Sequence, residues 1–134
     1  MQESILSAEV IAELKVASTR LAKACDEQSK RIVEADDRLA TMLCHAGVID
    51  PLPELVVQKS APKTTLVTRR VSSGYRVQVE IDNFNPDGAV TVTKPLTGLD
   101  VRLRSKVLPR LEAYAQLLAH ALAEASKTIE EQLK

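Results

Sequence analysis

The amino-acid sequence predicts an α+β fold in which two long helices bracket an antiparallel sheet of three or four strands. Three observations support it: a seven-residue apolar repeat in residues 5–46, the same repeat in 107–134, and two-residue alternation between them. The 134 residues fit one domain. The expected order is a helix (5–46), a loop (47–62), a sheet (63–104) and a helix (107–134).

The first helix is predicted because apolar residues recur at alternating offsets of three and four, as in coiled coils. Ser4 or Ser7 can cap its start by accepting a free backbone N–H. Gly47 is expected to end it in the left-handed conformation, and Pro51 and Pro53 prevent its resumption. The two seam positions read Ile11, Ser18, Cys25, Ile32, Leu39 and Ala46, and Leu14, Leu21, Gln28, Ala35 and Met42.

The middle of the chain is rich in β-branched residues and has the short period of strands. A tight turn at Ser72-Ser73-Gly74 is expected to join the two longest of them. Residues 99–104 alternate as well, although Leu99, Leu103 and Val107 also fit helical spacing, and a fourth strand is the preferred interpretation. The strands expected are 64–71, 74–81, 89–93 and 99–104, and 54–58, inside the expected loop, is a candidate for a further short strand.

The second helix repeats the seam, with Pro109 in or near its first turn, where a missing N–H is tolerated. The first helix exceeds it by roughly a dozen residues, about 18 Å, so part of the first seam lacks a partner within the chain. The helices can pair as an antiparallel hairpin with the sheet at one end, or flank the sheet and pair with copies of themselves. The predicted helix interface comprises Leu14, Leu21, Ile32, Leu39, Leu111, Leu118, Leu122 and Ile129.

The net charge is zero, yet residues 51–110 carry ten basic and five acidic groups. With 99–104 as a strand, alternation places Arg76, Arg102 and Arg104 on the solvent-facing side of the sheet. Such a face suits either solvent and an acidic protein partner or, alternatively, the nucleic-acid backbone. The cationic residues concerned are Arg70, Arg76, Arg102, Arg104 and Lys106.

The segment DNFNPDG at 82–88 resembles the start of a calcium loop. Counted from Asn83, however, the twelfth position is Lys94, where a calcium loop needs a bidentate glutamate. The segment is therefore predicted to be a turn between two strands, built from residues that tolerate unusual φ angles.

No catalytic, metal or cofactor signature is found in the sequence. Cys25 and Cys44 lie 19 positions apart on one predicted helix, too far for a mutual disulfide, and with Cys44-His45 and His120 they match no zinc spacing. Neither a secretory signal nor a membrane-length apolar run is visible, so a reduced, cytoplasmic location is expected.

The order of helix, strands and helix with heptad-patterned ends resembles the prefoldin-like coiled-coil chaperone subunits, which implies assembly through the sheet and client binding by the helical tips. It also resembles small bacterial nucleoid-associated proteins, which dimerise and bind DNA. This likeness lies in the pattern alone and transfers no functional residue. The favoured function is a non-enzymatic, homo-oligomeric protein-interaction module (an adaptor, small chaperone or structural subunit) that also binds another protein; the alternative is a nucleic-acid-associated protein.

Overall fold

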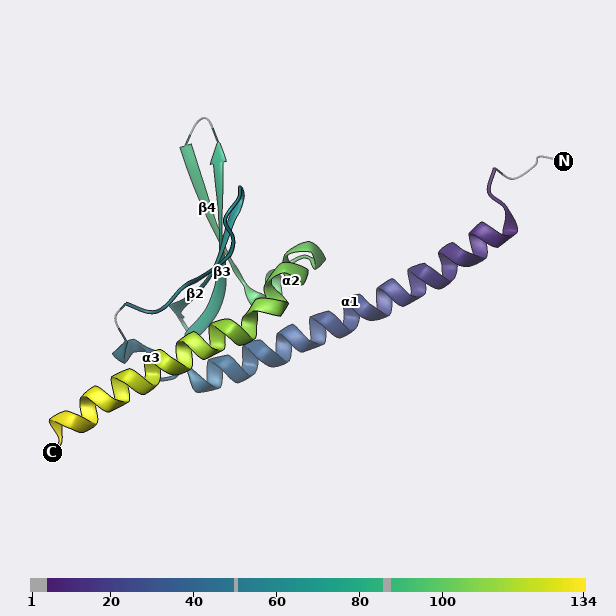
Figure 1. The fold of residues 1–134 in the computed structure, drawn as a ribbon. Coiled ribbons are helices and arrows are strands. Elements are labelled where there is room, and N and C mark those ends of the chain that lie inside the picture. The colour runs from purple at the N-terminus through teal and green to yellow at the C-terminus, as the bar shows by residue number, and fades with distance from the viewer. Residues whose placement is uncertain (1–4, 50, 86–87) are drawn as a thin grey trace.

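The computed structural model describes residues 5–49, 51–85 and 88–134. Its element order confirms the predicted α+β class: a long helix, a four-stranded antiparallel sheet and a second long helix (Figure 1). Three short 3₁₀ turns, at Ala46–Val48, Leu96–Gly98 and Leu108–Arg110, link these elements. The helices and strands are α1 (Ala8–Met42), β1 (Leu55–Gln58), β2 (Lys63–Val71), β3 (Gly74–Asn85), β4 (Gly88–Pro95), α2 (Val101–Val107) and α3 (Leu111–Gln132).

The start of α1 follows the prediction, and its end does not. The side chain of Ser7 accepts a hydrogen bond from the backbone N–H of Val10 at 3.2 Å, whereas Ser4 lies outside the described residues. The helix ends at Met42, and Gly47 lies in a 3₁₀ turn without a positive φ, so the predicted left-handed cap is wrong. A Cβ at Gly47 would lie 2.5 Å from the hydroxyl oxygen of Tyr75, so this glycine permits close packing instead.

The sheet has the strand order β1-β2-β3-β4, and every pairing is antiparallel. The predicted Ser72-Ser73-Gly74 turn joins β2 to β3, and the φ of 122° at Gly74 is one that glycine tolerates best. The segment 82–88 was predicted to be a turn, but residues 82–85 continue β3 and Gly88, at φ 130°, begins β4; Pro86 and Asp87, between the two strands, lie outside the described residues.

Residues 99–104 are not a strand, so the sheet ends at Pro95 rather than at residue 104. The Asp100 carboxylate accepts a hydrogen bond from the backbone N–H of Leu103 at 2.9 Å and thereby caps helix α2. Leu99 and Val107 are buried and Leu103 is half-buried, which fits the helical spacing of these apolar residues. The 107–134 helix therefore begins as α3 at Leu111, after the 3₁₀ turn that contains Pro109.

The core lies between one face of the sheet and the two long helices (Figure 1). The C-terminal half of α1 and the first half of α3 cover that face and run in the same direction, so the antiparallel hairpin is wrong. Each helix then extends beyond the body at an opposite end of the molecule (Figure 1). The largest buried core side chains are Ile32, Leu43, Leu66, Val77, Val79, Leu96, Val107 and Tyr114.

Candidate interaction surface

The first half of α1 extends away from the rest of the described chain (Figure 1). Every residue from Ala8 to Ala24 is exposed, and this segment is called the free half of α1 below. Leu14 and Leu21 are 56% and 64% exposed, although large apolar side chains gain most from burial. They belong to one side of the helix, the α1 stripe, which comprises Val10, Leu14, Ala17, Leu21 and Ala24 at alternating offsets of four and three.

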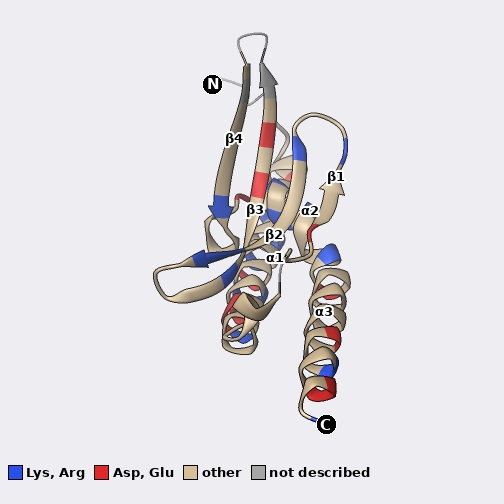
Figure 2. Cartoon of the chain, turned by 90° about the vertical axis from the view of Figure 1, so that its left-hand side faces the viewer, with Lys and Arg blue, Asp and Glu red and all other residues tan. Residues whose placement is uncertain are grey.

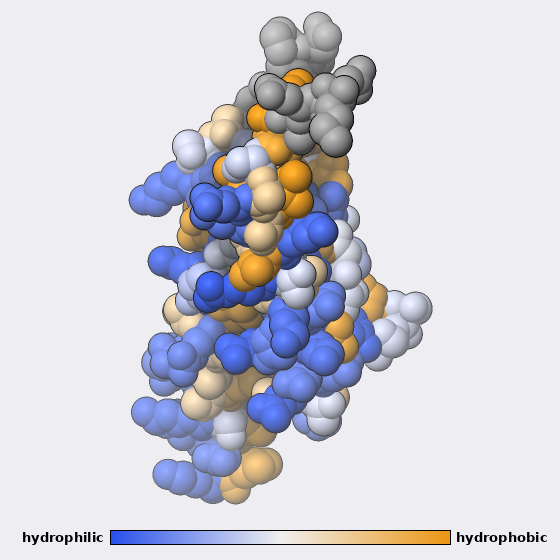
Figure 3. Space-filling model, turned by 90° about the vertical axis from the view of Figure 1, so that its right-hand side faces the viewer, coloured by the Kyte–Doolittle hydropathy of each residue, from blue (hydrophilic) through white to orange (hydrophobic). Residues whose placement is uncertain are grey.

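Figure 3 shows the molecule from the end at which the free half of α1 extends. Hydrophilic side chains cover most of this end, and separate apolar side chains lie exposed between them. The sequence explains the mixture, because Lys15, Arg20 and Lys23 are interleaved with the apolar residues of the free half. The free half is therefore an amphipathic helix whose apolar side has no cover in the described chain.

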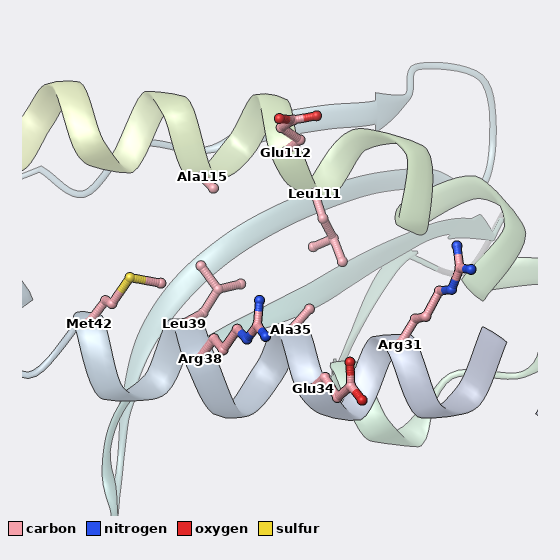
Figure 4. Close-up of a pocket in the computed structure, with 9 residues that line it drawn as sticks. All are labelled: Arg31, Glu34, Ala35, Arg38, Leu39, Met42, Leu111, Glu112 and Ala115. Carbon is pink, nitrogen blue, oxygen red and sulfur yellow. The ribbon is translucent and has the colours of Figure 1, made fainter. Parts of the chain in front are cut away.

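A groove separates the C-terminal part of α1 from α3. Its first hollow, of about 330 Å³, has Leu39 and Leu111 in its lining, pointing toward each other from the two helices (Figure 4). The small side chains of Ala35 and Ala115 leave the space between the helices open. The other residues lining it are Arg31, Glu34, Arg38, Met42 and Glu112.

The groove continues along α3 toward the C-terminus. A second hollow of about 350 Å³ shares Leu39 and Met42 with the first, and a third of about 290 Å³ shares Leu122 with the second. The three hollows are called the α1–α3 groove below. Burial decreases along it, from 2% exposure at Leu118 to 44% at Ile129. Leu122, Ala125 and Ile129 form the α3 stripe, which extends past the end of α1.

The predicted helix interface therefore divides into two groups. Ile32, Leu39, Leu111 and Leu118 are buried in the core of the chain itself. Leu14, Leu21 and Ile129 are exposed, and Leu122 is half-buried. The unpaired part of the seam is thus larger than the length difference between the helices suggests, because the two helices are also staggered.

The five predicted cations do not share one sheet face. Arg102, Arg104 and Lys106 belong to α2, which is not part of the sheet, and Arg104 donates a hydrogen bond to the side-chain oxygen of Gln28 at 3.1 Å. Arg70, on β2, is exposed. In Figure 2 the basic residues are dispersed, and β3 carries two acidic positions, which are Glu80 and Asp82 in the sequence. The continuous basic face is therefore not formed.

Two arginines of the β2–β3 hairpin are engaged in ion pairs. Arg69, on β2, contacts Glu80 on the neighbouring strand β3 at 2.7 Å and Glu54 at 3.4 Å. Arg76 was predicted to face solvent, and this is wrong: its guanidinium lies 2.9 Å from the carboxylate of Asp36 on α1. The hairpin is thereby attached to the helix that covers the sheet.

Asp36 is the charged group that the sequence interpretation missed. It is only 6% exposed and shares a helix face with the buried Ile32, Leu39 and Leu43. Burial raises the pKa of its carboxyl above the ordinary value of 3.8, against the attraction of Arg76, which lowers it. An acid within an otherwise apolar stripe, with arginines elsewhere in the chain, was the signal available in the sequence.

Tyr114 is a second polar group in the core. Its hydroxyl donates to the backbone carbonyl of Pro53 at 2.8 Å and lies 2.8 Å from the hydroxyl of Thr68, which is placed to donate to it. These bonds join α3, β2 and the segment before β1, and burial raises the pKa of the tyrosine. The network positions α3 on the sheet and suggests no reaction chemistry.

Among the residues that the structure describes, no three His, Cys, Asp or Glu side chains are grouped as a metal would require. Cys25 is half-buried, Cys44 is exposed, and both are free thiols. His120 is exposed. None of the helices in the described segments combines the length and apolar character needed to cross a bilayer.

Comparisons with protein families, with curated proteins and with solved structures find no match to this chain. The α1 stripe and the α1–α3 groove are therefore interpreted from their geometry alone.

Proposed function

We propose that this chain is a non-catalytic, self-associating interaction module that acts as an adaptor, small chaperone or structural subunit of a larger assembly. The observation that carries the proposal is the free half of α1, about 25 Å of amphipathic helix at ~1.5 Å per residue. Most helical stability in proteins comes from packing of the apolar face, and the free half has no such packing within the described chain.

A second feature supports the same function. The α1–α3 groove has an apolar floor and a charged rim of Arg31, Glu34, Arg38 and Glu112. This arrangement matches grooves that bind an amphipathic helix. In such grooves the apolar side chains of the bound helix pack on the floor, and the charged rim orients that helix. The chain thus carries both a helix to be covered and a surface able to cover one.

The proposal is tested by the mass of the full chain in solution. Sedimentation equilibrium across micromolar concentrations should show a dimer or a larger closed assembly, and a monomer throughout this range would refute self-association. As a matched pair, Leu21→Glu should weaken association at least tenfold, whereas Val16→Glu should not. Leu21 and Val16 are 64% and 60% exposed on the same helix, and only Leu21 belongs to the α1 stripe.

A further inference from the structure

Two apolar stripes of the described chain are not fully covered, and they lie at opposite ends of the molecule (Figure 1): the α1 stripe is exposed, and the α3 stripe passes from the half-buried Leu122 to the exposed Ile129. The α1 stripe precedes the body at one end, and the α3 stripe follows it at the other. Because α1 and α3 run in the same direction, the two stripes cannot meet within one chain. A second copy turned by a two-fold axis brings the free half of its α1 to the α3 end of the first copy, and the reverse contact forms by symmetry.

We propose that the α1 stripe of each copy packs on the α3 stripe and the adjoining α1–α3 groove of a second copy, in a reciprocal exchange of helices. This inference rests on the proposed self-association and specifies which surfaces meet. The helix-in-groove contact then supplies the free half of α1 with the neighbour that it lacks in the single chain.

The lengths of the two surfaces agree. The free half spans Ala8 to Ala24, about 25 Å, and the groove with the α3 stripe spans Leu111 to Ile129 on α3, about 27 Å. A helix about 10 Å wide covers about 250 Å² over this length. Two equal contacts, with both surfaces counted, bury about 1,000 Å², the size at which specific interfaces begin.

The charges favour this pairing over contact between two free halves. The free half carries three basic residues, Lys15, Arg20 and Lys23, and two acidic residues, Glu9 and Glu13, so its net charge is +1. Helix α3 carries four glutamates and one lysine: Glu112, Glu124, Glu130, Glu131 and Lys127. The exchange therefore brings a segment of net charge +1 to a helix of net charge −3, whereas two paired free halves bring together segments of like net charge.

Cross-linking tests which surfaces meet. In a background with Cys25→Ser and Cys44→Ser, one chain carries Leu14→Cys and a second chain of different mass carries Ile129→Cys. A short bis-maleimide should link the two chains in the mixture and should give no linked dimer with Leu14→Cys alone. Val16→Cys replaces Leu14→Cys in the matched control, and its yield of linked dimer should be at least several-fold lower.

Other outcomes separate the inference from the proposed function. Linked dimers of Leu14→Cys alone would show that free halves pair with each other, which overturns the exchange and keeps self-association. A dimer whose association is unchanged in Leu14→Glu/Leu21→Glu, or in Ile129→Glu, would place the contact elsewhere, for example on the edge strand β4. Both Leu14 and Ile129 are exposed, so these variants should retain the wild-type circular dichroism spectrum.

Discussion

Removal of the Arg76 guanidinium should destabilise this protein, although an arginine on a strand beside a turn usually faces solvent. In Arg76→Ala the carboxylate of Asp36 keeps its position against the sheet and loses its hydrogen-bond partner at 2.9 Å. The side chains of Asp36 and Arg76 are 8% and 35% exposed. The pair is thus buried on the acid side and partly hydrated on the basic side.

The expected magnitude follows from that asymmetry. Breaking a fully buried ion pair costs about 3–5 kcal/mol, because a charge is left without compensation. An unsatisfied buried polar group costs about 1–3 kcal/mol. Because water reaches Arg76 in the folded state, the smaller range applies. The free energy of unfolding should therefore fall by about 1–3 kcal/mol at pH 7.

The loss of stability caused by Arg76→Ala should also increase with pH. The folded pKa of Asp36 lies above its unfolded value of 3.8, so its contribution to stability is fully present below pH 3.8 and is lost as pH rises through the folded pKa. Arg76 lowers the pKa of Asp36, so the removal of Arg76 should raise this pKa further. The destabilisation by Arg76→Ala should therefore grow from pH 4.5 to pH 7.

Urea unfolding followed by circular dichroism, at fixed protein concentration, measures both effects. Arg70→Ala is the matched control, because Arg70 is exposed on the neighbouring strand, and it should stay within about 0.5 kcal/mol of wild type. In Asp36→Asn/Arg76→Ala the two effects should not add, since the two side chains contact each other. An Arg76→Ala variant as stable as Arg70→Ala at pH 7 would refute the reasoning.

Four further predictions test the core, the exposed seam and a turn. Tyr114→Phe removes the hydroxyl that is hydrogen-bonded to Thr68 and should lower the free energy of unfolding, measured in urea, by about 1–2 kcal/mol. An unchanged free energy of unfolding would show that this hydrogen-bond network does not stabilise the fold. Leu118→Asp should abolish the folded circular dichroism spectrum, because burying an unpaired carboxylate costs several kcal/mol. Leu21→Asp should keep that spectrum and weaken only the association seen by sedimentation, and unfolding of this variant would contradict its exposure. Gly74→Ala should lower the melting temperature, since alanine at φ 122° costs about 1–2 kcal/mol, and an unchanged melting temperature would show that the turn relaxes freely.

The periodicity of the sequence determined most of the fold. A seven-residue repeat without internal proline or glycine predicts a long helix wherever it occurs, and alternation of β-branched residues predicts strands. The class, the order of elements, the Ser7 cap and the turn at Gly74 were all predictable, because each depends on neighbouring residues. The same local rules favoured a strand at 99–104, which is wrong, because the Asp100 side chain caps a helix there.

Tertiary structure alone decided which residues meet. Sequence patterns assign a side chain to a face of a helix, but they contain neither the stagger of α1 and α3 nor their common direction. These two features decide that Leu118 is buried whereas Leu21 is exposed. They likewise cannot show that Arg76 reaches Asp36, 40 positions earlier in the chain. Both outcomes depend on how the helices pack on the twisted sheet, and such long-range geometry arises only when the whole core forms.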